Sequence, residues 1–139
     1  MLKIRAEQIQ AFQEEAEISF VRRLVEYLQQ RHGNVIVQLP QGPAIVKQVP
    51  NEALHEMARN GIARAREYGM NWESSLAAFV VLMFISAPNF DEHPTVRRVL
   101  QDKGIAPESR VNHLLERISQ HEWETINKDY DVKAWNLSL

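Results

Sequence analysis

The sequence predicts an all-α fold: a compact bundle of about five helices around a central apolar helix at about residues 72–86. The first observation behind this prediction is a run of ten apolar residues, Leu76 to Ile85, with polar sequence on both sides. A helix of that length is about 15 Å long and a bilayer core is about 30 Å thick, so we expect no membrane span. Because the run is apolar around its whole circumference, we expect other helices to cover it on all sides. The second observation is that the neighbouring segments repeat apolar residues at steps of three and four, as amphipathic helices do.

The bulk composition indicates one globular domain and argues against several classes of function. The 139 residues, 45% of them hydrophobic, suffice for a single domain over residues 1–139 with its own core. A net charge of -2 argues against a general nucleic-acid binder, which needs a concentrated basic face. The absence of cysteine excludes disulfides, thiolate chemistry and cysteine-ligated metals. No apolar stretch follows the charged residues among positions 1–5, so we expect no signal peptide and a cytoplasmic location.

The first helix is predicted from about Ala6 to Arg31. Its apolar residues follow helical steps and should form one buried stripe, with the charged residues mostly off that stripe. The stripe consists of Ile9, Phe12, Ala16, Phe20, Leu24, Tyr27 and Leu28. Gly33 follows the helix, and we expect it to end the helix in a left-handed conformation.

Residues 33–50 form an irregular stretch with three prolines and two short β-branched runs around a turn signal at Gln41–Pro43. This pattern allows either a small hairpin or an extended loop laid over the core. The apolar residues of the stretch either complete the core or dock against another protein. The candidate partner-binding residues here are Val35, Ile36, Val37, Ile45 and Val46.

A second helix is predicted from Glu52 to about Tyr68, with Asn51 as its N-cap and Gly69 closing it. Gly61 lies inside this helix, where glycine costs about 1 kcal/mol relative to alanine, so close helix–helix packing is expected there. Asn71 is the expected cap of the central helix.

After Pro88, which stops the central helix, a short helix is predicted at about Thr95–Lys103 and a last one at about Pro107–Trp123. The tail, about residues 124–139, is expected to be loosely attached in part. Trp135 in this tail is the tryptophan best suited to anchor an interface.

No candidate catalytic, metal or cofactor site survives inspection of the spacing. His55-Glu56 and His121-Glu122 resemble the start of a zinc-protease helix, which needs a second histidine four residues after the first. Those positions hold Arg59 and Thr125, so both candidates fail. Asp91, Glu92 and His93 are consecutive in a loop and should diverge, whereas acid–base catalysis needs groups that converge on one atom. We therefore expect no enzyme and no cofactor, with Asp91 or His93 capping the next helix.

One combination of motifs resembles a family of small helical bacterial proteins that are encoded beside type VI secretion spike (VgrG and PAAR-type) and effector genes. The combination is Gly61-Ile-Ala-Arg-Ala-Arg-Glu-Tyr-Gly-Met70, then Leu82-Met-Phe84, then Phe90-Asp91 followed by Pro94. The family has no established catalytic residues, so the resemblance implies structural roles for these positions. We expect the glycines to serve close packing and helix termination, and the arginine to pair with an acid or a carbonyl. We expect the phenylalanine to lie in the core and the aspartate to cap a helix. The residues concerned are Gly61, Arg64, Tyr68, Gly69, Phe90, Asp91 and Pro94.

The resemblance implies a non-enzymatic interaction protein: a cytoplasmic adaptor or chaperone for a secreted effector or spike component. The alternative is an immunity protein that binds and inhibits a cognate toxin. The third reading, an enzyme, would need a pocket lined by convergent polar groups, for example around Arg64, Asp91 and His93.

Overall fold

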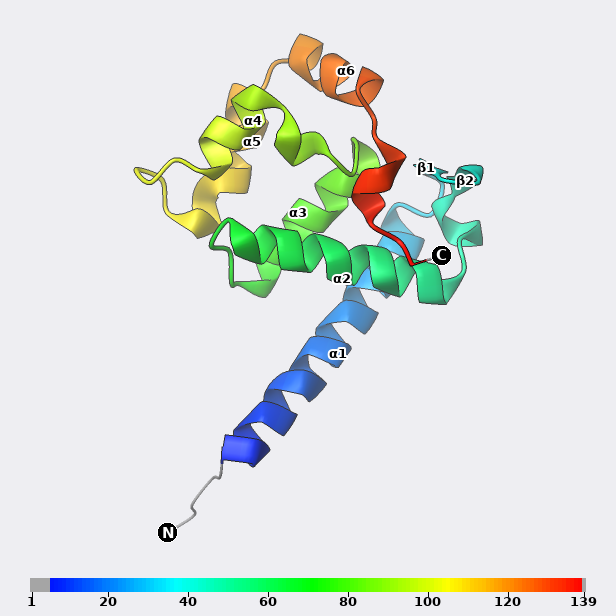
Figure 1. The fold of residues 1–139 in the computed structure, drawn as a ribbon, viewed down its shortest axis with the longest axis vertical. Coiled ribbons are helices and arrows are strands. Elements are labelled where there is room, and N and C mark those ends of the chain that lie inside the picture. Colours follow the sequence, from blue (N-terminus) through cyan, green and yellow to red (C-terminus); the bar gives the residue numbers. More distant parts are fainter. Residues whose placement is uncertain (1–5, 139) are drawn as a thin grey trace.

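The all-α architecture is confirmed in a computed structural model that describes residues 6–138. Within that range six α-helices, one two-stranded hairpin and four short 3-10 turns alternate along the chain. Five of the helices and the hairpin form the body, and the first half of α1 projects from it (Figure 1). The helices are α1 (Ala6–Arg31), α2 (Asn51–Glu67), α3 (Glu73–Ile85), α4 (Pro94–Leu100), α5 (Arg110–Arg117) and α6 (Gln120–Lys128).

Helix α3 lies at the centre of the core, as the apolar run predicts. Five of its side chains are at most 1% exposed: Leu76, Phe79, Val80, Met83 and Phe84. Helix α2 crosses it so closely that a Cβ atom on Gly61 would lie 2.7 Å from Met83 Sδ and 2.9 Å from Val80 Cγ2. The expected close packing at Gly61 is therefore confirmed, since the glycine leaves room for the α3 side chains.

The expectation that α3 is covered on all sides is wrong. Ala77, Ala78 and Val81 are only half-buried, and Ile85 is 49% exposed. These residues follow helical steps of three and four and so form one strip along α3. The strip stays uncovered because α1 and α5 flank it without closing over it, as described below.

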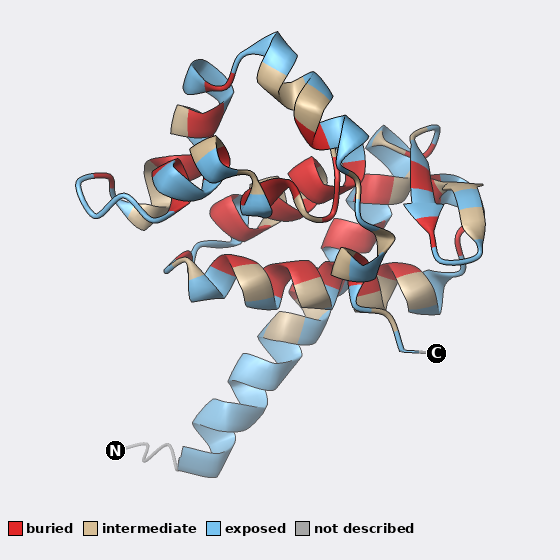
Figure 2. Ribbon diagram, turned by 45° about the horizontal axis from the view of Figure 1, so that its top comes forward, coloured by how far each residue is buried: buried red, intermediate tan, exposed pale blue. Residues whose placement is uncertain are grey.

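The single buried stripe predicted for α1 is confirmed only in the second half of the helix. Phe20, Leu24 and Leu28 are buried, whereas residues 6–16 are all exposed, Phe12 at 65%. Tyr27 also remains about half exposed. The 26-residue helix is about 39 Å long, and its first turns extend beyond the body that covers the rest (Figure 2). We call residues 6–19 the arm.

The stretch at residues 33–50 forms the hairpin alternative. Strands β1 (Ile36–Leu39) and β2 (Gly42–Ile45) pair antiparallel, with Ile36 opposite Ile45 and Leu39 opposite Gly42. Gly42 adopts φ +128° at the turn, which an L side chain rarely adopts. The hairpin belongs to the body, because Val37 and the following Val46 are fully buried.

The helix ends differ from the prediction in several places. Residues Pro50 and Trp72 occupy the N-cap positions of α2 and α3, so Asn51 and Asn71 do not cap these helices. Gly69 ends α2 with φ +92° as expected. Gly33 does not adopt the left-handed conformation; a Cβ atom there would instead lie 2.3 Å from the main-chain oxygen of Gln29.

The predicted fourth helix ends early and the predicted last helix is divided. Helix α4 stops at Leu100, before the expected Lys103. The last helix is broken at Ile118, which has extended backbone angles, and α6 starts after Ser119. Ser119 and Glu122 form a reciprocal capping box, the side chain of each accepting from the main-chain N–H of the other.

The C-terminal tail packs on the body. Trp135 is fully buried; its ring centroid lies 4.9 Å from that of Phe84, and its Nε1 donates to the main-chain oxygen of Gln38 at 2.9 Å. The tail is expected to be attached only in part, and the turn Val132–Trp135 belongs to the attached part, because the indole finds both an apolar pocket and an acceptor there. Among residues 6–138, no helix combines the length and apolarity that a bilayer crossing requires.

Candidate functional site

An apolar groove of about 520 Å³ runs along the uncovered strip of α3. Its floor comes from α3, one wall from the second half of α1, and the other wall from α5. The lining residues are Phe20, Arg23, Leu24 and Tyr27 of α1; Ser74, Ala77, Ala78, Val81, Leu82 and Ile85 of α3; and Val111 and Leu115 of α5. Small residues in mid-floor, Ala77 and Ala78, give the groove its depth, because their side chains do not fill the space between the walls.

The groove carries little charge. Among the lining residues, Arg23 and Tyr27 are ionisable, and Arg23 carries a charge at neutral pH. Its Nη2 lies 3.3 Å from Glu73 Oε2, so this charge is partly neutralised within the chain. A second apolar depression of about 250 Å³ adjoins the groove, sharing Leu82, Ile85 and Leu115 and ending at Trp123 of α6. Together they make one apolar surface across α1, α3, α5 and α6.

The arm extends the α1 wall of this groove. Ile9, Phe12 and Ala16 precede the wall residue Phe20 by helical steps of three and four, so they share its face of α1. All three are exposed. The base of the arm is fixed to the body, since Arg66 of α2 donates from Nη2 to Glu17 Oε2 at 2.7 Å. Beyond this contact the apolar ridge of the arm, Ile9, Phe12 and Ala16, faces solvent.

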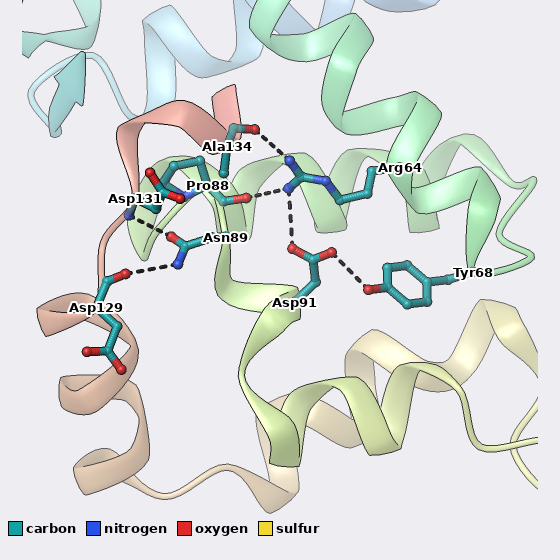
Figure 3. A network of polar contacts seen from close by, with 8 residues as sticks. All are labelled: Arg64, Tyr68, Pro88, Asn89, Asp91, Asp129, Asp131 and Ala134. Atoms are coloured by element: carbon teal, nitrogen blue, oxygen red, sulfur yellow. Dashed lines mark hydrogen bonds and ion pairs between the residues drawn. The ribbon is translucent and has the colours of Figure 1, made fainter. Parts of the chain in front are cut away.

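The motif residues Arg64, Tyr68 and Asp91 meet in a polar network between α2 and the turn Phe90–Glu92 (Figure 3). Arg64 Nη1 donates to Pro88 O and to Asp91 Oδ1, the latter at 3.3 Å, and Arg64 Nη2 donates to Ala134 O at 2.6 Å. Tyr68 donates its hydroxyl to Asp91 Oδ2 at 2.9 Å. The expected pairing of Arg64 with an acid and with carbonyls is confirmed.

This network positions the chain and leaves no reactive group free. Asp91 is 2% exposed and both its oxygens accept hydrogen bonds, so it does not cap α4 as expected; the N-cap His93 makes no side-chain cap bond either. Burial, reinforced by the Asp91 carboxylate, raises the pKa of Tyr68 to about 12. Because Tyr68 keeps its proton at neutral pH, it acts there as a hydrogen-bond donor and not as a base.

His93 does not join Arg64 and Asp91 in a pocket. It lines a separate depression of about 210 Å³ with Glu92, Asn89 and Asp129, and its buried Nδ1 has no hydrogen-bond partner among the described residues. Within residues 6–138, no three His, Asp or Glu side chains lie close enough together to hold a metal ion. The convergent polar pocket that an enzyme would need is not formed by these three residues.

A polar depression of about 800 Å³ lies on another side of the body and carries three cations, Arg97, Lys103 and Arg110. Arg110 is buried and joins separate segments of the chain, because its Nε donates to Ile105 O at 3.1 Å and its Nη1 to Tyr68 O at 2.6 Å. The depression therefore combines these cations with the carboxylate of Glu67 beside the end of α2.

The predicted partner-binding residues are dispersed by the fold. Val37, Val46 and Trp135 are fully buried, which corrects their assignment as surface contacts; each completes the core instead. Ile36 is exposed, while Val35 and Ile45 are half-buried. Of the structural motif, Gly61, Phe90 and Asp91 lie in the core, and Pro94 begins α4.

Sequence reasoning missed the groove and the arm. The available signal was the pair Ala77 and Ala78, two small side chains inside a run of large ones, together with a first helix longer than the others. Comparison of the chain with protein-family models, with curated proteins and with solved structures gives no match.

Proposed function

We propose that this protein is a non-enzymatic protein-interaction module whose working surface is the groove together with the exposed ridge of the arm. The observation that carries the proposal is an apolar groove whose α1 wall continues into the exposed apolar ridge of the arm. Monomeric proteins rarely leave large contiguous apolar patches in water, and such patches mark protein contacts. The network of Arg64, Tyr68 and Asp91, by contrast, is hydrogen-bonded within the chain and serves the fold.

The shape of the groove favours a helical segment as its occupant. The floor from Ser74 to Ile85 covers 11 helical steps, which is about 16 Å, and helices wall it on both sides. An amphipathic helix with apolar residues at positions i, i+3, i+4 and i+7 fits such a groove. A bound helix would also close the strip of α3 that the fold leaves open.

The partner to test first is the one that the sequence resemblance implies: a secreted effector or a type VI spike component, for which this chain would act as adaptor or chaperone. An all-α body with a fixed, uncovered binding face supports that role. In such a role the chain would shield an apolar helix of the effector from water before export.

The acidity of the arm favours a second candidate, an immunity protein. Glu7, Glu14, Glu15 and Glu17 lie in residues 6–19 with no basic residue among them. An acidic projection of this kind would be attracted to a basic toxin cleft, which raises association rates. The two roles differ genetically: loss of an immunity protein exposes the cell to a sibling's toxin, and loss of an adaptor abolishes delivery.

The experiment is co-expression and co-purification of the full chain with type VI effector and spike proteins from the same genome. We expect a stable complex that Leu115→Glu in the groove wall weakens and that Ile36→Glu on the hairpin does not. Leu115 and Ile36 are 59% and 61% exposed, so the two variants are matched for burial. Absence of any complex, or equal loss with both variants, would count against the proposal.

A further inference from the structure

We infer that the groove takes the arm of a second copy of this chain, so that two copies form a symmetric dimer through reciprocal arm-in-groove contacts. The inference rests on the proposed function, because it uses the same face and names an occupant for it. The chain itself carries the kind of helix that the groove fits: an exposed amphipathic segment with apolar residues at steps of three and four, Ile9, Phe12 and Ala16.

The first argument is the self-complementarity of one face. The ridge of the arm and the groove lie on the same side of α1, because the ridge runs by helical steps into the wall residues Phe20 and Tyr27. A two-fold interface requires one patch that fits its own copy. With the two α1 helices antiparallel, each ridge lies over the other copy's groove.

The second argument is size. The ridge from Ile9 to Ala16 covers seven helical steps, about 10 Å, and the groove floor is about 16 Å long. The ridge therefore fits within the groove. The small floor residues Ala77 and Ala78 leave space there for a large side chain, and Phe12 is the largest that the ridge offers.

The third argument is charge. At 100° per residue, Glu7 and Glu14 lie opposite the ridge, and Glu15 and Glu17 lie to its sides. The ridge itself is uncharged, and the charge of Arg23 in the groove is paired with Glu73. Docking of one copy on another thus buries neutral surface and leaves the acidic face of each arm in water. A basic partner attracted by charge would instead bind the acidic face and leave the ridge uncovered.

The fourth argument concerns the arm as a helix. Most helical stability in proteins comes from packing of an apolar face. The arm is the part of the 26-residue helix α1 that lacks such packing, since residues 6–16 are all exposed in the single chain (Figure 2). The groove of a second copy supplies the missing cover for the ridge.

The test is the solution mass of the full chain by light scattering over about 1–100 μM, a range that covers micromolar dissociation constants. We expect twice the chain mass of 16.1 kDa at the upper end. Phe12→Glu and Leu115→Glu should each raise the dissociation constant more than about tenfold, because a charge would be buried in an apolar contact. Ile18→Glu is the matched control: Ile18 is 67% exposed, against 65% for Phe12, and lies on the opposite side of the arm.

Mixing the two monomeric variants sharpens the test. In a mixed dimer, the unaltered arm of the Leu115→Glu chain meets the unaltered groove of the Phe12→Glu chain, so one of two contacts is restored. We expect the mixture to dimerise more strongly than either variant alone. A 16.1 kDa species at every concentration, or equal effects of Phe12→Glu and Ile18→Glu, would overturn the inference. A dimer without effector binding would instead remove only the effector role, so the two failures are distinguishable.

Discussion

The indole Nε1 of Trp135 donates to the main-chain oxygen of Gln38 at 2.9 Å, joining the end of the described chain to its hairpin. The same ring packs on Phe84 of α3. One side chain from the tail therefore bridges two elements that are about 50 and 100 residues away along the chain. This explains why a segment that reads as loosely attached is part of the core.

Trp135→Ala should destabilise the protein by about 3–5 kcal/mol, because it removes a fully buried aromatic side chain and leaves a cavity. Trp135→Phe should cost less, since an aromatic ring is retained and the Gln38 oxygen loses one of its two donors while the Tyr130 hydroxyl remains. Urea unfolding followed by circular dichroism measures both. Equal and small effects of the two substitutions would show that the tail does not contribute to the core.

Gly61→Ala should destabilise the protein in spite of alanine's higher helix propensity. The new methyl group would lie 2.9 Å from Val80 Cγ2 and 2.7 Å from Met83 Sδ, and overpacking of this kind costs about 1–3 kcal/mol. Adding Val80→Ala should recover part of the loss that Gly61→Ala causes, which a double-mutant cycle detects. A stabilised Gly61→Ala variant would show that α2 and α3 are not in close contact there.

Stability should fall as the pH rises between about 10 and 12, partly through Tyr68. Burial and Asp91 raise its pKa from 10.0 in the unfolded chain to about 12 in the folded one, so the unfolded state loses its proton first. The stabilisation is complete below pH 10 and is lost through pH 12. Tyr68→Phe should flatten this decline in chemical unfolding experiments at stepped pH. The pKa of Tyr130 is also raised by burial, so part of the decline should remain.

Ser119→Ala should cost about 1 kcal/mol, the usual value for loss of a helix N-cap. Ser119 Oγ accepts from the main-chain N–H of Glu122 at 3.1 Å and starts α6 after the break at Ile118. The control for replacing a serine by alanine is Ser74→Ala in the first turn of α3. Ser138 is less suitable, because it contacts Glu56. An unchanged midpoint in urea for Ser119→Ala would contradict the capping role.

The sequence predicts most of the core because α3 and α2 carry strong periodic or continuous apolar signals. The motif around Gly61, Arg64 and Gly69 also behaves structurally as expected. The features that local sequence patterns failed to predict depend on contacts between segments that are distant along the chain. Asp91 reads as a helix cap, yet it pairs with Arg64 and Tyr68 because α2 passes beside its turn.

The candidate site was out of reach for a related reason. The first helix repeats apolar residues along its whole length. Periodicity alone does not show at which residue the rest of the protein stops packing against this helix. Phe12 and Phe20 are equivalent in that pattern, but Phe20 meets the body while Phe12 extends beyond it. The groove likewise depends on the spacing between α1 and α5, which no stretch of sequence encodes by itself.

The most direct test of the arm-and-groove surface is disulfide cross-linking between two single-cysteine chains, Phe12→Cys and Ala78→Cys. The natural chain has no cysteine, so no natural thiol competes, and the mixed disulfide is separated from the two homodisulfides by mass. Each variant carries a single thiol, so any disulfide joins two copies. We predict efficient formation of the mixed cross-linked species under mild oxidation, and little of it when Ile18→Cys replaces Phe12→Cys. Equal yields from the two arm positions, or no cross-link at all, would contradict the account.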